Sequence, residues 1–245
     1  MHAQVLNLGL VPYREAWELQ RSVAAEVASG ASPDTVLLLE HPPVVTLGRR
    51  TEPGELHLPE GAKVEIVETD RGGKSTYHGP GQLVCYPIFD LTRHGQDVKK
   101  YCRDLEEALI ITLKSCGLEG ARISGLTGIW LPATSLAMSP GGRAGFTGTA
   151  GRSSPPRKIA SIGIHISKWV STHGYALNVD LDPAPFTDWI TACGLEDTHF
   201  TTIARELGRS VTVDEVRPHA VAGLADVFNL QFEEQRAYAE LAASS

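Results

Sequence analysis

The stretch RGGKSTYHGPGQLVCYPIFDL, residues 71–91, decides the fold. Its second half, from Gln82 onward, is an apolar run that is typical of a strand buried on both faces. Its first half combines four glycines and a proline with two cations and a histidine. A segment with unusual backbone freedom and many polar groups therefore leads directly into the core of the protein.

The sequence before this stretch predicts one helix and three strands. Residues 13–29 carry apolar side chains at helical spacing, and Gly30 suits the end of that helix. The run TVLLLEHPPVVTLG, residues 35–48, predicts two short buried strands separated by two prolines. Alternating residues in KVEIVETD, residues 63–70, predict a further strand.

Strands and helices also alternate after the stretch. A helix is expected over residues 97–116, a hairpin that turns near Gly125, and a mobile loop over residues 133–157. Two paired strands, KIASIGIHIS and VSTHGYALNVD, follow, with a short helix near Pro183 and another over TTIAREL. The last helix opens at Thr212 with a capping box, and Pro218 is expected to bend it.

These elements predict an α/β (α+β) fold with a mixed central β-sheet flanked by helices. We expect residues 1–230 to form a single domain and residues 231–245 a C-terminal tail. Because the chain carries 29 acidic and 22 basic residues, with a net charge of −7, it does not resemble a general nucleic-acid binder.

Targeting and redox signals point to the cytoplasm. The N-terminal residues lack the pattern of a signal peptide, and no apolar stretch is long enough to cross a bilayer. The four cysteines form no C-x-x-C pair, so they are expected to be free thiols in a reducing compartment. No metal site is expected, because the histidines and cysteines show no recognised ligand spacing.

The glycine-rich half of the stretch has three possible interpretations. Its glycines form simple turns, or a phosphate-binding P-loop, or a backbone cradle whose N–H groups approach a ligand. The P-loop is rejected because Glu68 stands where that motif needs a glycine. A cradle explains the mixture of glycines, cations and histidine better than turns alone.

Five motifs in order give the chain a resemblance to a known family. RGGKSTYHGPGQ resembles the signature of the lipoyl(octanoyl) transferase family, R-G-G-x-x-T-x-H-G-P-G-Q. The chain also has counterparts of that family's other elements, namely EHPPVVTLGRR, RKIASIG, HGYALN and ACG. The resemblance spans roughly residues 5–225, and it implies the architecture of the biotin and lipoate protein ligase catalytic domains.

The resemblance implies an acyltransferase. Such an enzyme moves an octanoyl (or lipoyl) group from acyl carrier protein to a lysine of a lipoyl domain, with no cofactor. The implied acceptors are the lipoyl domains of 2-oxoacid dehydrogenase E2 subunits and the glycine cleavage H protein. No nucleic acid or membrane partner is expected.

The family pattern nominates Cys193 as the nucleophile and Lys158 as its partner. Cys193 lies between small neighbours, whereas Cys85, Cys102 and Cys116 lie in apolar strand or helix patterns and are expected to be packing residues. A cation beside Cys193 would favour its thiolate. The matched motifs imply further contacts to the substrate from Arg71, Gly72, Gly73, Lys74, Ser75, Thr76, Tyr77, His78, Ala160, Ser161, Ile162, His173, Gly174 and Tyr175.

Three other functions are consistent with parts of the sequence. An ATP-dependent lipoate or biotin protein ligase shares the implied architecture and also uses a lysine, but needs no nucleophilic cysteine. A non-catalytic acyl-binding protein would use the cradle only to hold a fatty chain. A cysteine hydrolase would release the acyl group to water.

Overall fold

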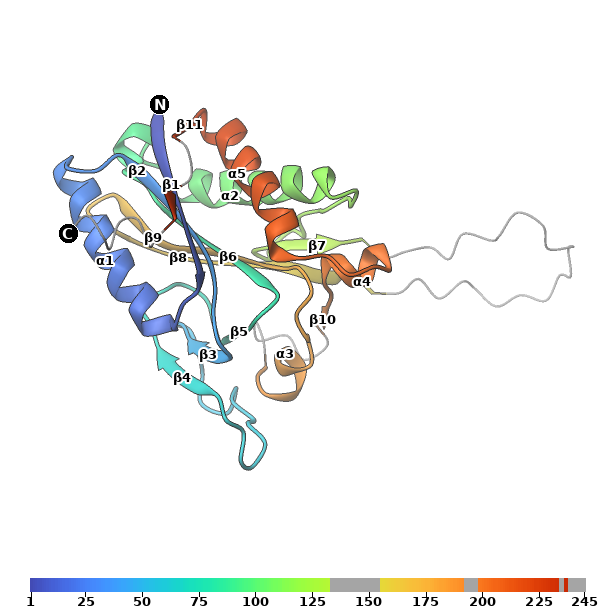
Figure 1. Cartoon of the computed structure of the whole chain (residues 1–245). Helices are drawn as coiled ribbons and strands as arrows, with labels where there is room; N and C mark the ends of the chain where they lie inside the picture. The colour runs from blue at the N-terminus through green and yellow to red at the C-terminus, as the bar shows by residue number, and fades with distance from the viewer. Residues whose placement is uncertain (133–154, 192–197, 234–235, 238–245) are drawn as a thin grey trace, which may run out of the picture.

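The computed structural model describes residues 1–132, 155–191, 198–233 and 236–237 of the chain. The predicted mixed sheet is confirmed, in the strand order β10-β8-β9-β6-β2-β1-β11. Strand β1 runs parallel to β2, whereas β6 is antiparallel to both β2 and β9, and β8 is antiparallel to β9 (Figure 1). The strands of this sheet are β1 (His2–Leu10), β2 (Asp34–Glu40), β6 (Gln82–Ile88), β7 (Ile129–Leu131), β8 (Arg157–Ser167), β9 (Val170–Asn178), β10 (His199–Phe200), β11 (Gln231–Phe232) and β12 (Arg236–Ala237).

A second, three-stranded sheet carries the glycine-rich segment. Strand β3 (Val44–Leu47) lies between β4 (Glu65–Glu68), to which it is parallel, and β5 (Thr76–His78), to which it is antiparallel. The strands expected on either side of the two prolines are therefore present as β2 and β3. Strand β5 lies inside the stretch whose local structure the sequence left open.

Helices cover the two faces of the main sheet. Helix α1 (Tyr13–Ser29) packs on one face, and helices α2 (Val98–Ser115) and α5 (Val213–Phe228) pack on the other (Figure 1). Shorter helices are α3 (Pro185–Asp188), α4 (Ile203–Leu207) and the 3₁₀ turn η1 (Leu91–His94). In the part of the chain that the structure describes, no helix is long and apolar enough to cross a membrane.

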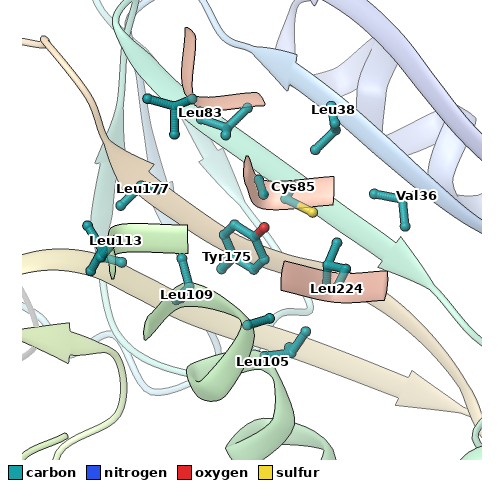
Figure 2. Close-up of a cluster of buried hydrophobic side chains, with 14 of the residues drawn as sticks. Val36, Leu38, Leu83, Cys85, Leu105, Leu109, Leu113, Tyr175, Leu177 and Leu224 are labelled. Atoms are coloured by element: carbon teal, nitrogen blue, oxygen red, sulfur yellow. The ribbon is translucent and has the colours of Figure 1, made fainter. Parts of the chain in front are cut away.

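Strand β6 shows why the deciding stretch reads as continuously apolar. Leu83 and Cys85 point into the cluster beneath α2 and α5, as Figure 2 shows, whereas Val84 and Tyr86 point into the cluster beneath α1. All seven residues of β6 are buried. Because both faces of the strand meet apolar side chains, no polar alternation survives in its sequence.

Side-chain caps mark the starts of α2 and α5. Asp97 accepts hydrogen bonds from the backbone N–H groups of Lys99 and Lys100 at the start of α2. Thr212 and Glu215 form the expected capping box at the start of α5. That helix continues through Pro218 to Phe228.

Several boundaries differ from the sequence-based expectation. The first arm of the predicted hairpin is reduced to one bridge, in which Ala121 and Trp130 exchange two backbone hydrogen bonds. The second arm, β7, pairs mainly with β8. Residues 133–154 of the expected loop lie outside the described residues, and β8 already begins at Arg157. In the predicted tail, β11 and β12 pair with β1.

Candidate active site

A cavity of about 380 Å³ lies where the glycine-rich segment faces strands β8 and β9. Most of its wall comes from the glycine-rich segment, the main sheet and the turn before β7, and Tyr13 of α1, Cys102 of α2 and Arg50 after β3 complete it. The lining residues are Tyr13, Arg50, Arg71, Gly72, Gly73, Lys74, Ser75, Thr76, His78, Val84, Tyr86, Cys102, Gly125, Leu126, Thr127, Trp130, Lys158, Ser161, Ile162, Gly163, Ile164, His173, Gly174, Tyr175 and Ala176. Most of the sequence-predicted site residues are in this set.

The glycine-rich segment is fixed by Arg71, whose side chain is buried. The guanidinium donates to the backbone oxygen of Thr46 on β3 at 2.7 Å and to the backbone oxygen of Lys74 at 2.8 Å. The N–H of Gly72 donates to the backbone oxygen of Ile164 on β8 at 2.8 Å. These bonds tie the segment to both sheets, so its backbone has a defined conformation next to the cavity.

The second cation of the segment, Lys74, is already paired. Its ammonium contacts the carboxylates of Glu55 and Glu52, the latter at 3.3 Å. The hydrogen bond to Glu55 raises the pKa of Lys74, with Glu52 adding to the effect. Among the described residues, the buried hydroxyl of neighbouring Ser75 has no hydrogen-bond partner. A polar substrate atom would satisfy that hydroxyl.

Two of the predicted contact residues do not line the cavity. Because side chains alternate along β5, Thr76 and His78 face the cavity and Tyr77 points to the other side. The Tyr77 ring packs edge-on against Trp189, with ring centroids 5.4 Å apart. Ala160 lies in the core cluster beneath α2 and α5. The side chains of Tyr77 and Ala160 thus lie away from this cavity, although both residues were expected to line the acyl site.

Buried histidines form one wall of the cavity and the layer behind it. His78 contacts the Gln82 side chain at 2.7 Å, and His41 contacts the Tyr86 hydroxyl at 2.8 Å. Burial lowers the pKa of His41 to about 4 and that of His78 well below its usual range. Both imidazoles are therefore neutral at pH 7, which keeps this wall compatible with an apolar ligand.

His173 is held in a conformation unusual for its residue type. Its φ is +56°, its Nε2 lies 2.7 Å from Asp70, and its backbone N–H donates to the side chain of Gln20 at 2.7 Å. The same Asp70–His173 hydrogen bond lowers the pKa of the Asp70 carboxyl. A Cβ on the next residue, Gly174, would lie 2.2 Å from the backbone oxygen of Cys85, so only glycine fits there.

The predicted catalytic lysine lies in the cavity wall. Lys158 is only 3% exposed, and its Nζ lies 5.4 Å from the centroid of the Trp130 ring. Cys193 lies outside the described residues.

The remaining cysteines are poor nucleophiles. Cys85 is fully buried, and burial raises the pKa of its thiol to about 12. Burial likewise raises the pKa values of Cys102, which lines the cavity, and of Cys116, which does not. Since the thiolate is the reactive form, these three thiols are ill suited to attack a thioester.

Several lining residues were missed by sequence reasoning. Tyr13 and Tyr86 come from a helix and a strand that the sequence did predict, but only as packing elements. The turn at residues 125–127 and Trp130 belong to none of the quoted motifs. The local signal was the apolar triplet Ile129–Leu131, and it does not show to which face of the sheet the Trp130 side chain points.

Comparison with known proteins confirms the resemblance drawn from the motifs. The model of the lipoyl protein ligase A/B catalytic domain matches residues 12–225. An octanoyltransferase of Mycolicibacterium smegmatis is 46% identical over 227 residues, which cover 92% of this chain and 89% of the relative. An octanoyltransferase of Mycobacterium tuberculosis is 48% identical over 221 residues, covering 90% and 84%.

Solved structures share the fold at low sequence identity. A bipartite lipoate protein ligase from Thermoplasma acidophilum superposes with a TM-score of 0.67 at 17% identity, covering all of this chain and 90% of the other. A lipoate-protein ligase A bound with ATP gives a TM-score of 0.68 at 17% identity, covering all of this chain and 92% of the other. The predicted ligase-like architecture is thus confirmed. The chain belongs to the lipoyl protein ligase A/B catalytic domain family and groups there with the octanoyltransferases.

Proposed function

We propose that the protein is an octanoyltransferase that moves an octanoyl group from acyl carrier protein to a lysine amine of a lipoyl domain, through a thioester on Cys193. Support comes from the octanoyltransferases that are 46–48% identical over about nine-tenths of the chain. The observation that carries the chemical assignment is Lys158, a lysine only 3% exposed on a cavity wall. Lysine side chains are almost never fully buried unless they are paired.

The first half-reaction transfers the acyl group to the enzyme. The Cys193 thiolate attacks the carbonyl carbon of the donor thioester, a carbon–sulfur bond forms, and the bond to the carrier thiol breaks. Lys158 donates a proton to the departing thiolate. The N–H of Gly72 is already bonded to Ile164, so the backbone N–H groups of Gly73 and of residues 161–163 are the candidates to stabilise the oxyanion.

The second half-reaction returns the enzyme to its starting state. The acceptor lysine attacks the enzyme thioester as a neutral amine, an amide bond forms, and the Cys193 thiolate departs. Lys158 takes the proton that the amine loses. No ATP enters this scheme, because the donor thioester already supplies the free energy for amide formation.

The cavity wall suits a medium-length acyl chain. Val84, Ile162, Ile164 and Ala176 supply apolar surface, and the buried imidazoles beside them are neutral. Burying about six methylene groups at ~0.8 kcal/mol each contributes ~5 kcal/mol to binding. We propose that the lipoyl domains of 2-oxoacid dehydrogenase E2 subunits and the glycine cleavage H protein are the acceptors, in the cytoplasm.

The test is transfer without ATP. Purified protein is mixed with octanoyl carrier protein and an unmodified lipoyl domain, and the mass of the lipoyl domain is followed. Octanoylation is expected, with Cys193→Ser and Lys158→Ala each slowing it by about 100-fold or more. Cys116→Ser is the matched control, because Cys116 does not line the cavity, and it is expected to retain the wild-type rate.

Each alternative function predicts a different outcome of that assay. Dependence on ATP and free octanoate would indicate a ligase, and release of octanoate to water would indicate a hydrolase. An acyl chain that leaves the denatured protein without covalent attachment would indicate a binding protein. Any of these three results contradicts the proposed function.

A further inference from the structure

Trp130 lies opposite Lys158 in the main sheet. The two residues are register partners in the antiparallel pairing of β7 with β8, where a bulge shifts the register between Ile129 and Trp130. Ile129 and Leu131 belong to the core cluster beneath α2 and α5, whereas Trp130 lines the cavity. Because cross-strand partners project to the same side, the Trp130 ring stands beside the Lys158 side chain.

The ammonium of Lys158 lies within cation–π distance of that ring. Its Nζ is 5.4 Å from the ring centroid, and both side chains are at least 96% buried. A cation near the face of tryptophan is attracted by the quadrupole of the ring, more strongly when water is excluded. The pair therefore favours one location of Nζ, beside the ring.

Gly128 leaves room for the lysine on its other flank. A Cβ at this position would lie 3.0 Å from Cε of Lys158 and 2.4 Å from the backbone oxygen of Ala160. The N–H of Gly128 donates to Glu106 of α2 at 3.3 Å, and that buried carboxylate is paired with Arg122 at 3.0 Å. The turn before β7 is thus anchored to α2, and it fixes the wall against which Lys158 lies.

Trp130 contributes through its ring rather than through its N–H group. Among the described residues, the buried indole nitrogen donates to no acceptor. The aromatic face is consequently what this side chain offers to its neighbours. A phenyl ring would supply the same kind of face, and an aliphatic side chain would not.

We propose that Trp130 is a positioning residue for Lys158, holding its ammonium at the cavity wall where proton transfer takes place. This inference rests on the proposed function, since it assigns a role to Trp130 only if Lys158 transfers protons in the reaction. It predicts that the ring affects the chemical steps and not the binding of the acyl donor.

Two substitutions of Trp130 distinguish the effect of its aromatic ring from the effect of filling the same space. Trp130→Leu is expected to lower kcat by about tenfold with KM for octanoyl carrier protein changed less than twofold. Trp130→Phe is expected to keep kcat within about threefold of wild type. Leu131→Ala is the matched control on the opposite face of β7: it lowers the thermal midpoint without this loss of kcat. If Trp130→Leu fails to fold, Trp130→Met replaces it in the same comparison.

A double-mutant cycle gives the decisive readout. Adduct formation on Cys193 is followed in single turnovers by intact mass, which detects slow variants. In the Lys158→Ala background, Trp130→Leu is expected to cause no further slowing, because the ring then has no ammonium to position. Equal slowing in both backgrounds would overturn the inference, and so would a raised KM with unchanged kcat.

The result also separates this inference from the proposed function. Full activity of Lys158→Ala would reject the catalytic role of Lys158 itself. Loss of activity in Lys158→Ala, together with wild-type kcat in Trp130→Leu, would reject only the role of Trp130.

Discussion

At the scale of single residues, the site combines buried histidines that are neutral with a buried arginine whose guanidinium is fixed by hydrogen bonds. His41 and His78 are kept neutral by burial. Arg71 is surrounded by backbone and hydroxyl oxygens from Thr46 and Lys74. An apolar chain and a reacting thioester need this combination, because the first requires an uncharged wall and the second requires fixed dipoles and cations.

The neutral state of His41 predicts a pH-dependent stability. Its pKa is about 4 in the folded protein against about 6.5 in the unfolded chain, so the unfolded chain binds the extra proton between these values. Its contribution is present above about pH 6.5 and is lost as the pH falls toward 4. His78 and His173, whose pKa values are also lowered, act in the same direction.

Urea unfolding between pH 4.5 and 7.5 measures this effect. Near pH 5, His41→Asn is expected to reduce the slope of unfolding free energy against pH by about 1.4 kcal/mol per pH unit, which corresponds to one proton. His2→Asn, which changes an exposed histidine, is the matched control. An unchanged slope in His41→Asn would show that His41 titrates normally in the folded protein.

At the scale of elements, the sequence predicted the strands and helices whose patterns lie within a few neighbouring residues. Strand β6 was predicted because seven consecutive residues are buried on both faces, and α5 because Thr212 and Glu215 form its cap. The sequence did not predict that Tyr77 points away from the cavity, because a three-residue strand is too short to show an alternation of apolar and polar side chains. Trp130 was missed because its place depends on pairing with Lys158, 28 positions later.

The capping box of α5 gives a second prediction. The Thr212 hydroxyl accepts from the backbone N–H of Glu215 at 3.2 Å, and Glu215 accepts from the N–H of Thr212 at 3.0 Å. Thr212→Ala is expected to lower the free energy of unfolding by about 1 kcal/mol. The N–H of Glu215 then loses its acceptor, and the carboxylate of Glu215 is held less firmly against the N–H of residue 212. Thr212→Ser keeps the hydroxyl and should retain most of the wild-type free energy of unfolding. Equal losses for the two variants in urea unfolding would contradict the role of the cap.

At the scale of the whole molecule, both faces of the main sheet contribute to the cavity: Cys102 of α2 and Tyr175 of the core beneath α2 and α5 line it together with residues from the α1 face. Helices α2 and α5 cover one face with a large apolar core, part of which Figure 2 shows. On the other face, α1 and the small sheet bring Tyr13 and the glycine-rich segment to the cavity. The fold is shared with ligases at 17% identity, whereas an octanoyltransferase of Mycobacterium tuberculosis is 48% identical over 90% of the chain.

Leu224 tests whether the core face is independent of the site. Its side chain is fully buried between α5 and the sheet, among Leu105, Cys85 and Tyr175 (Figure 2). Leu224→Ala is expected to lower the free energy of unfolding by about 2–5 kcal/mol through the lost contacts and the cavity that remains. At temperatures where the variant is folded, its kcat/KM should equal that of wild type. A selective loss of activity in the folded variant would show that the two faces are coupled.

Lys158 and Cys193 are proposed to act together at one cavity, and rapid-quench acylation is the decisive test of that proposal. Enzyme is mixed with octanoyl carrier protein without acceptor, and intact mass follows the adduct. We expect one octanoyl group on Cys193, formed quickly in the wild type, transferred when a lipoyl domain is added, and formed about 100-fold more slowly in Lys158→Ala. Adduct formation at the wild-type rate in Lys158→Ala, or octanoyl transfer that leaves Cys193 unmodified throughout, would contradict it.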